Sequence, residues 1–254
     1  MLHHAITGGS ERPTLLLHGF LGSGRNLRTL ANGWSKRDPA RQLVMIDLPG
    51  HGESPPPPPG ARLKDLAESV IQTVRALKLE PPWAICGHSM GARVGLMIAG
   101  QSPQEVASLA MLDVAPGPIP VERQTSVGVM KTLLAAPATA PDRKTMRDWL
   151  TGAGLSGPIA DWLALNLESA DGGVKWRIDR ERLAQLHPGV SAEDLWPIAE
   201  SRPAPLTVVR GARSHYVTDE DFARLTSIGA LTATVQAGHD VHVEATDAVL
   251  DVVA

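Results

Sequence analysis

A serine between two glycines is the pattern in this sequence that most directly suggests covalent chemistry. The stretch Cys86–Ala92 reads CGHSMGA, which places Ser89 in a G-x-S-x-G pattern. An apolar run, WAIC, precedes it, and a helix-like segment follows through Ala99. In a strand–turn–helix context this pattern is a nucleophile elbow, whose tight turn leaves no room for side chains at Gly87 and Gly91. The pattern therefore predicts a nucleophilic serine whose hydroxyl projects above a sheet, at the positive end of the next helix.

A serine hydroxyl is a weak nucleophile, so it needs a base, and the base needs an orienting acid. We expect the base on the loop after the last strand, which reads AGHDVHVE. His239 directly follows Gly238 at the end of that strand, whereas His242 stands at the beginning of the next helix. We therefore predict that His239 is the base and that His242 has a structural role.

The sequence identifies the acid less directly than it identifies the base. The loop after the preceding strand reads GARSHYVTDED and contains no carboxylate before Asp219. One strand earlier, the stretch AMLDVAP places Asp113 at the end of a strand next to the nucleophile strand. We predict Asp113 as the acid, with Asp219 as the alternative. A strand-end cap is the non-catalytic interpretation of Asp113.

A tetrahedral intermediate of acyl transfer needs about two backbone donors for its oxyanion. We expect one donor from the N–H of Met90, which follows the nucleophile, and one from Phe20 in the stretch LLLHGFLGSG. This glycine-rich stretch lacks the lysine of a phosphate-binding loop, so it does not indicate nucleotide binding. No cofactor is expected.

Short apolar runs alternate with helical patterns along the chain, and together they would position these residues. Six runs have the continuous apolar character of strands covered on both faces: 14–19, 42–52, 83–87, 108–114, 205–211 and 231–238. Helical spacing is clear in residues 63–79, after Ser89, and in residues 243–253. This alternation predicts an α/β fold with a mostly parallel central sheet flanked by helices.

One long stretch breaks this alternation. Residues 117–202 show several helix-like pieces and no series of strands. We predict a helical cap inserted after the sixth strand, over the sheet edge where open α/β sheets bind ligands. Residues 1–116 and 203–254 would then form the core. The tryptophans of the insertion are either part of its own core or candidates for substrate binding, which are Trp149, Trp162 and Trp196.

Composition excludes several other classes of protein. The chain has 254 residues, a net charge of −3 and one cysteine, Cys86. No basic stripe suggests a nucleic-acid partner, no apolar run is long enough for a membrane span, and the first residues do not resemble a signal peptide. A single cysteine excludes a disulfide framework, and no cluster in the sequence resembles a metal site. These features favour a cytoplasmic protein and leave its oligomeric state open.

The motifs together resemble the α/β-hydrolase superfamily: HGF near residue 19, DLPGHGES, GHSMGA and AGHDVHVE. The stretches LDVAP, RGARSHYV and KWRIDRERL are similar to YbfF-like small acyl esterases. This resemblance implies a Ser89, Asp113 and His239 triad that acts on short acyl and acyl-CoA esters. The chain departs from the family at Ala92, where a second glycine is common, and at Asp240, which stands beside the candidate base.

The leading prediction is a serine hydrolase that cleaves carboxylic esters, or thioesters such as acyl-CoA, of short to medium acyl chains. A C–C bond hydrolase or a menaquinone-pathway-type lyase would use the same triad and would need an arginine in the pocket, for which Arg93 is the candidate. A non-enzymatic ligand receptor of this fold is the third interpretation.

Overall fold

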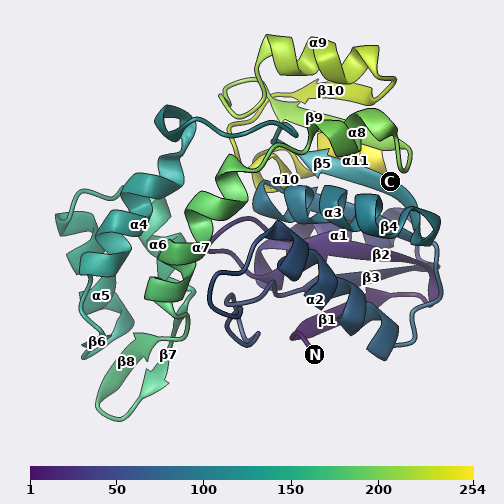
Figure 1. Ribbon diagram of the computed structural model, residues 1–254. Helices are drawn as coiled ribbons and strands as arrows, with labels where there is room; N and C mark the ends of the chain where they lie inside the picture. Colours follow the sequence, from purple (N-terminus) through teal and green to yellow (C-terminus); the bar gives the residue numbers. More distant parts are fainter.

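The computed structural model describes residues 1–254 and is built on a seven-stranded sheet in the order β1-β3-β2-β4-β5-β9-β10 (Figure 1). The strands are β1 (His4–Gly8), β2 (Glu11–Leu17), β3 (Arg41–Ile46), β4 (Trp83–His88), β5 (Val106–Leu112), β9 (Leu206–Gly211) and β10 (Leu231–Val235). Only β1 runs antiparallel, along β3, and every other pair of neighbours is parallel. This confirms the predicted α/β fold with a mostly parallel sheet.

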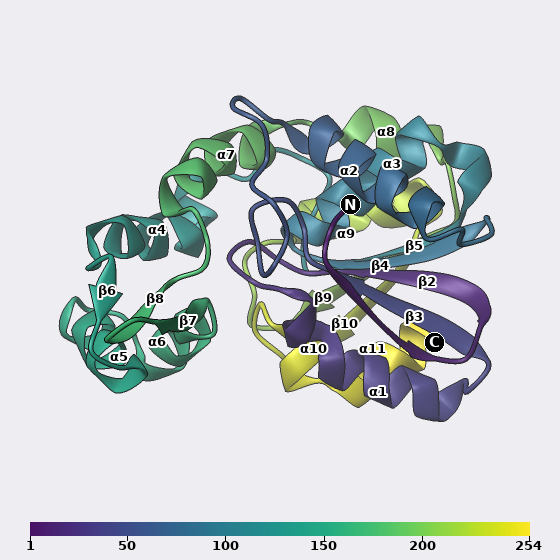
Figure 2. The same ribbon diagram turned by 90° about the horizontal axis from the view of Figure 1, so that it is seen from below.

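Helices cover both faces of the sheet (Figure 2). One layer consists of α1 (Arg28–Arg37), α10 (Val241–Glu244) and α11 (Thr246–Val253). The other consists of α2 (Leu63–Ala76), α3 (Met90–Gln101), α8 (Trp196–Ser201) and α9 (Asp219–Ser227). Short 3-10 turns lie at Gly24–Leu27, Pro103–Glu105 and Val121–Arg123. Because both faces are covered, the last four residues of β2, β3, β4 and β5 are buried whichever way they point.

Two elements of the core gave no clear sequence signal. The edge strand β1 is a five-residue segment without buried positions, so it shows no apolar run. In α1, only Leu30, Ala31 and Trp34 are buried, and its other residues are mostly polar. Such half-exposed elements are held by their tertiary contacts more than by local pattern.

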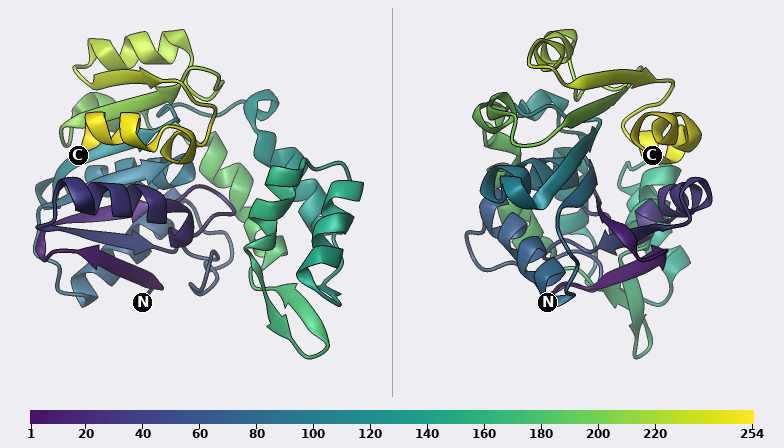
Figure 3. Two further views of the ribbon diagram at one scale, coloured as in Figure 1. Left: turned by 180° about the vertical axis from the view of Figure 1, so that it is seen from behind. Right: turned by 90° about the vertical axis from the view of Figure 1, so that its right-hand side faces the viewer.

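Residues between β5 and α8 form a separate group of elements beside the core, which we call the cap (Figures 1 and 3). It contains α4 (Thr125–Ala135), α5 (Arg143–Gly152), α6 (Gly157–Ala164) and α7 (Arg180–Ala192). It also contains a small antiparallel sheet of β6 (Thr139–Ala140), β7 (Leu167–Ala170) and β8 (Gly173–Trp176). The sequence showed no strands here because these three are only two to four residues long.

Two further predictions about this insertion need correction. The cap follows β5, the fifth strand of the chain, and not the sixth, because only one antiparallel strand precedes β2. The predicted boundary at residue 202 is also too late, since α8 packs against α3 of the core. A Cβ placed on Gly100 would lie 2.8 Å from the side chain of Ile198, which shows how closely these two helices approach.

None of the helices combines the length and the apolar character that crossing a bilayer requires.

Candidate active site

The turn at Ser89 has the strained geometry that the sequence predicts. Ser89 has φ 50° and ψ −118°, a conformation that a non-glycine residue adopts only when its surroundings impose it. A Cβ placed on Gly91 would lie 2.2 Å from the carbonyl oxygen of Leu17, and one on Gly87 would lie 2.5 Å from the carbonyl oxygen of Gly91. Only glycine fits at these two positions, so the turn that exposes Ser89 depends on both.

The structure brings His239 and Asp113 together at the same edge of the sheet. His239 Nδ1 lies 2.7 Å from Asp113 Oδ2. A carboxylate can only accept, so Nδ1 carries the proton and Nε2 keeps its lone pair. Asp113 is fully buried and has φ 54°, a left-handed conformation that aspartate tolerates better than most residues. These contacts give His239 the tautomer that a general base requires.

Two further donors hold the Asp113 carboxylate. The Gly211 amide donates to Oδ1 at 2.8 Å, and the Ser214 hydroxyl donates to Oδ2. Ser214 belongs to the loop after β9, which has no carboxylate before Asp219, and its hydroxyl supports the acid that follows β5. The alternative acid, Asp219, instead pairs with Arg210 at 2.7 Å and has a side chain that is 96% exposed.

Tyr216 is a site residue that the sequence did not reveal. Its ring stacks on His239 with centroids 3.9 Å apart and planes inclined by 20°. Its hydroxyl lies 3.2 Å from the Thr125 hydroxyl at the start of α4. Tyr216 therefore covers one face of the imidazole and links the loop after β9 to the cap.

The loop that carries Phe20 is tied to its neighbours by side chains. His18 Nε2 accepts the Leu48 amide at 2.9 Å, so its Nδ1 carries the proton and donates to the Gly19 carbonyl at 2.8 Å. Asn166 of the cap donates to the Leu21 carbonyl at 3.0 Å. The amides of Phe20 and Met90 donate to no other group of the protein, and both residues line the cavity described next.

A cavity of about 570 Å³ lies between the sheet edge and the cap, and Ser89 and His239 both line it. This volume is in the range of small-molecule sites. The core contributes Phe20, Leu21 and Met90, and the cap contributes apolar side chains. Those cap side chains are Ile119, Val129, Ile159, Trp162 and Val190.

Of the three tryptophans predicted to bind substrate, only Trp162 lines this cavity. Trp149, on α5, is half-buried and packs against the edge of the buried apolar cluster. Trp196 is 5% exposed and lies beneath the Arg224 guanidinium, 4.0 Å from the ring centroid. The predictions for Trp149 and Trp196 are corrected accordingly, because each ring is used in packing away from the cavity.

Arg93 lines the cavity, but its guanidinium is bonded to backbone carbonyls of the fold. Its guanidinium donates to the carbonyls of Val190 (3.0 Å) and Gly117 (2.7 Å), and also to those of Ala115, Pro116 and Glu193. Burial lowers the pKa of Arg93 to about 10, which still leaves it charged at neutral pH. Most of the Arg93 donors are therefore used by the backbone at the two places where the cap joins the core.

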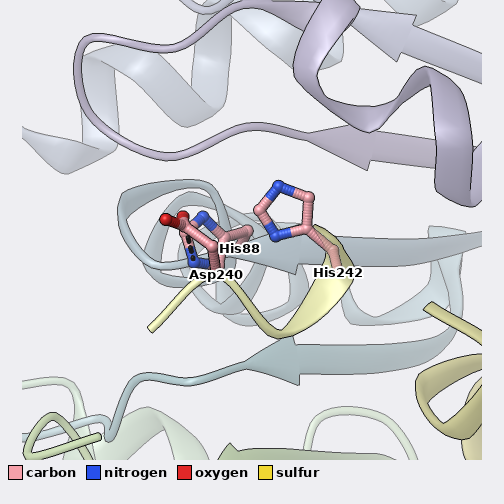
Figure 4. Close-up of side chains that lie close together, drawn as sticks. All are labelled: His88, Asp240 and His242. Carbon is pink, nitrogen blue, oxygen red and sulfur yellow. Dashed lines mark ion pairs between the residues drawn. The ribbon is translucent and has the colours of Figure 1, made fainter. Parts of the chain in front are cut away.

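His88, the last residue of β4, lies against the loop that carries His239. His88 Nε2 donates to the His239 carbonyl at 2.9 Å, and the two rings have centroids 4.6 Å apart. His242 is buried, and its ring lies 4.4 Å from that of His88. With Asp240 these two histidines form a cluster that the sequence did not suggest, because His88 is distant from the others along the chain (Figure 4).

Comparison with known proteins agrees with this architecture. The family model of the alpha/beta hydrolase fold matches residues 13–142. The sn-1-specific diacylglycerol lipase ABHD11 of Xenopus laevis is 26% identical over 245 residues, which cover 92% of this chain and 76% of the relative. Esterase Rv0045c of Mycobacterium tuberculosis is 27% identical over 260 residues, which cover 97% and 83% of the two chains.

A solved structure of a marine microorganism esterase is similar over nearly the whole chain. It has a TM-score of 0.88 and 25% identity, and the match covers 98% of this chain and 97% of that one. The family model spans the strands from β2 to β5 and includes the turn at Ser89. On the evidence of its sheet, its strained serine turn and this match, the chain belongs to the α/β-hydrolase fold family.

Proposed function

We propose that this protein hydrolyses carboxylic esters, or thioesters, through an acyl-enzyme formed on Ser89. The single observation that carries the proposal is the hydrogen bond from His239 to the buried Asp113, made beside the cavity that Ser89 lines. The similar lipases and esterases support the same class of reaction.

In this proposal each residue has a defined role. Ser89 Oγ attacks the acyl carbon while His239 Nε2 takes its proton and later delivers it to the leaving group. Asp113 keeps the imidazole oriented and stabilises the imidazolium that forms. The free amides of Phe20 and Met90 stabilise the oxyanion, and water then releases the acid.

The cap is proposed to determine which acyl groups fit. We assign this role to the insertion after β5, whose apolar side chains line the wall of the cavity opposite Ser89. A cavity of about 570 Å³ that is lined by Val129, Ile159 and Trp162 favours short to medium acyl chains. The use of Arg93 within the fold argues against the alternative of a C–C hydrolase or lyase with an arginine in its pocket.

Replacement of the nucleophile tests the proposal. Ser89→Ala is expected to lower hydrolysis of p-nitrophenyl butyrate by about a thousandfold or more and to abolish labelling by a fluorophosphonate. Ser102→Ala, at the opposite end of α3, is the matched control and should keep both properties. A fluorophosphonate adduct that persists in Ser89→Ala, or an unlabelled wild-type protein, would refute the proposed role of Ser89.

A further inference from the structure

Three potential metal ligands lie together beside His239: His88, Asp240 and His242 (Figure 4). Each offers one nitrogen or oxygen atom, and these atoms all lie within 4.8 Å of one another. His88 ends β4 immediately before Ser89, whereas the other two lie at the start of α10. All three line the active-site cavity, so an ion that enters from solvent can reach them.

The cluster contains a nitrogen atom that nothing in the protein satisfies. His242 is 4% exposed, and its buried Nδ1 has no hydrogen-bond partner. A buried polar atom without a partner costs free energy, and natural structures contain few of them. His88 Nε2 lies 3.9 Å from Asp240 Oδ1 and donates to the His239 carbonyl. The cluster therefore contains a buried imidazole nitrogen that no protein group uses.

We propose that His88, Asp240 and His242 bind one divalent transition-metal ion of the Zn²⁺ type, and that the bound ion inhibits the enzyme. Two imidazoles and one carboxylate suit Zn²⁺, Co²⁺ or Ni²⁺, whereas Ca²⁺ and Mg²⁺ prefer oxygen ligands throughout. In a tetrahedral Zn²⁺ site the ligand atoms lie about 3.4 Å apart. The Asp240 side chain is 65% exposed and is free to close the remaining distance.

Inhibition follows from where the ion would lie. Binding through His88 Nε2 replaces its hydrogen bond to the His239 carbonyl, so the loop that carries the base loses a contact. The ion also places positive charge next to His239, which opposes the positive charge that the imidazole gains in the transition state. Metal binding itself does not depend on the proposed function, whereas the inhibition rests on it.

The test measures binding and activity separately on the full chain. Zn²⁺ binding is followed by calorimetry, and Co²⁺ binding by its visible absorption, after treatment with a chelator. One ion should bind to the wild-type protein, and Asp240→Ala should weaken binding by about tenfold or more. His242→Gln should weaken it similarly. His215→Asn removes an exposed histidine outside the cluster and should bind as the wild type does.

The same series is then assayed with p-nitrophenyl butyrate. Zn²⁺ should inhibit the wild type over the range in which the site fills, and Asp240→Ala should need about ten times more ion. Unchanged binding in both Asp240→Ala and His242→Gln would overturn the metal site. Binding that disappears in His239→Asn but survives in Asp240→Ala would place the ion on the proposed base instead. Binding without inhibition would overturn only the inhibitory role. If the wild-type protein has no esterase activity but its ion binding still depends on Asp240, the proposed function fails and the metal site stands.

Discussion

At the scale of single residues, the arrangement around His239 shows that the acid can come from an earlier strand and still form the hydrogen bond to the imidazole. The Asp113 carboxylate follows the end of β5, whereas the loop after β9 has no carboxylate before Asp219. That loop contributes the Ser214 hydroxyl and the stacked ring of Tyr216 instead. Parallel strands end at the same edge of a sheet, so a carboxylate from either strand can reach one imidazole.

Asparagine substitutions distinguish the two candidate acids. In Asp113→Asn the amide can donate to Nδ1, which would shift the imidazole to the wrong tautomer, and we expect kcat to fall by about ten-thousandfold. In Asp219→Asn only an exposed pair with Arg210 is lost, so activity should stay close to that of the wild type. Steady-state kinetics on one p-nitrophenyl ester provides the comparison, and equal losses in the two variants would contradict the assignment of Asp113.

At the scale of elements, Arg93 joins the nucleophile helix to the cap. It lies in the first turn of α3, and its guanidinium bonds to the segment that leaves β5 and to the C-terminal end of α7. Five carbonyls share one buried charge without a carboxylate in hydrogen-bond contact. Arg93 thus ties the nucleophile helix directly to both places where the cap joins the core.

Removal of this side chain should destabilise the fold. Arg93→Met keeps the length of the chain but leaves the carbonyls of both connecting segments without their donor, at a cost on the order of 3 kcal/mol. Arg28→Met removes an exposed arginine from α1 and should change stability by about 0.5 kcal/mol or less. Urea denaturation compares the two variants, and similar unfolding midpoints would argue against the role described for Arg93.

The cap wall should control acyl length through Trp162. Trp162→Ala enlarges the cavity, so the ratio of kcat/KM for octanoate over butyrate p-nitrophenyl esters should rise by about tenfold. Trp149→Ala removes the same kind of side chain from a half-buried position on α5 that does not line the cavity, and it should leave this ratio near its wild-type value. The opposite pattern would indicate that α5 and not α6 forms the wall.

At the scale of the whole molecule, one apolar core joins the cap to the sheet. A cluster of 48 buried residues extends from α2 and α3 into the cap, where it includes Leu133 and Leu163. A second cluster of 16 residues lies under α1 and α11 and stays within the core. Several histidines near the active site are buried and neutral at pH 7. Because they take up protons only when the chain unfolds, the stability of the whole molecule depends on pH.

Stability should fall as the pH is lowered through the ordinary range of histidine. Burial, with some help from His18, lowers the pKa of His51 to about 3, and burial together with His239 lowers that of His242 to about 4. Below pH 6.5 the unfolded chain takes up protons at these positions and the folded chain does not. Each such histidine therefore lowers the free energy of unfolding by about 1.4 kcal/mol for each pH unit below 6.5, and it has no effect well above that pH.

Urea denaturation between pH 7.5 and about 5 measures this slope. His242→Gln should reduce the slope by about the share of one histidine, whatever its effect on stability at neutral pH. His215→Gln changes an exposed histidine and should leave the slope as it is. A slope that is the same in all three proteins would show that His242 is not kept neutral by the fold.

The sequence by itself determined the features that rest on local pattern. The strands β2, β3, β4, β5, β9 and β10 were predicted because strands covered on both faces are continuous apolar runs. The serine turn was predicted because two glycines are sterically required within one short stretch. Ser89, Asp113 and His239 could be proposed as partners because each follows a strand of one parallel sheet.

Only the tertiary structure decided the features that depend on contacts between distant segments. It showed which tryptophan lines the cavity. The sequence could not show this, because a tryptophan packed inside the cap and one at the cavity wall occur in the same kind of apolar pattern. It placed Arg93 against carbonyls that lie up to 100 positions away along the chain. It also brought His88 to Asp240 and His242, because β4 and β10 end at the same edge of the sheet, a proximity that no local spacing encodes.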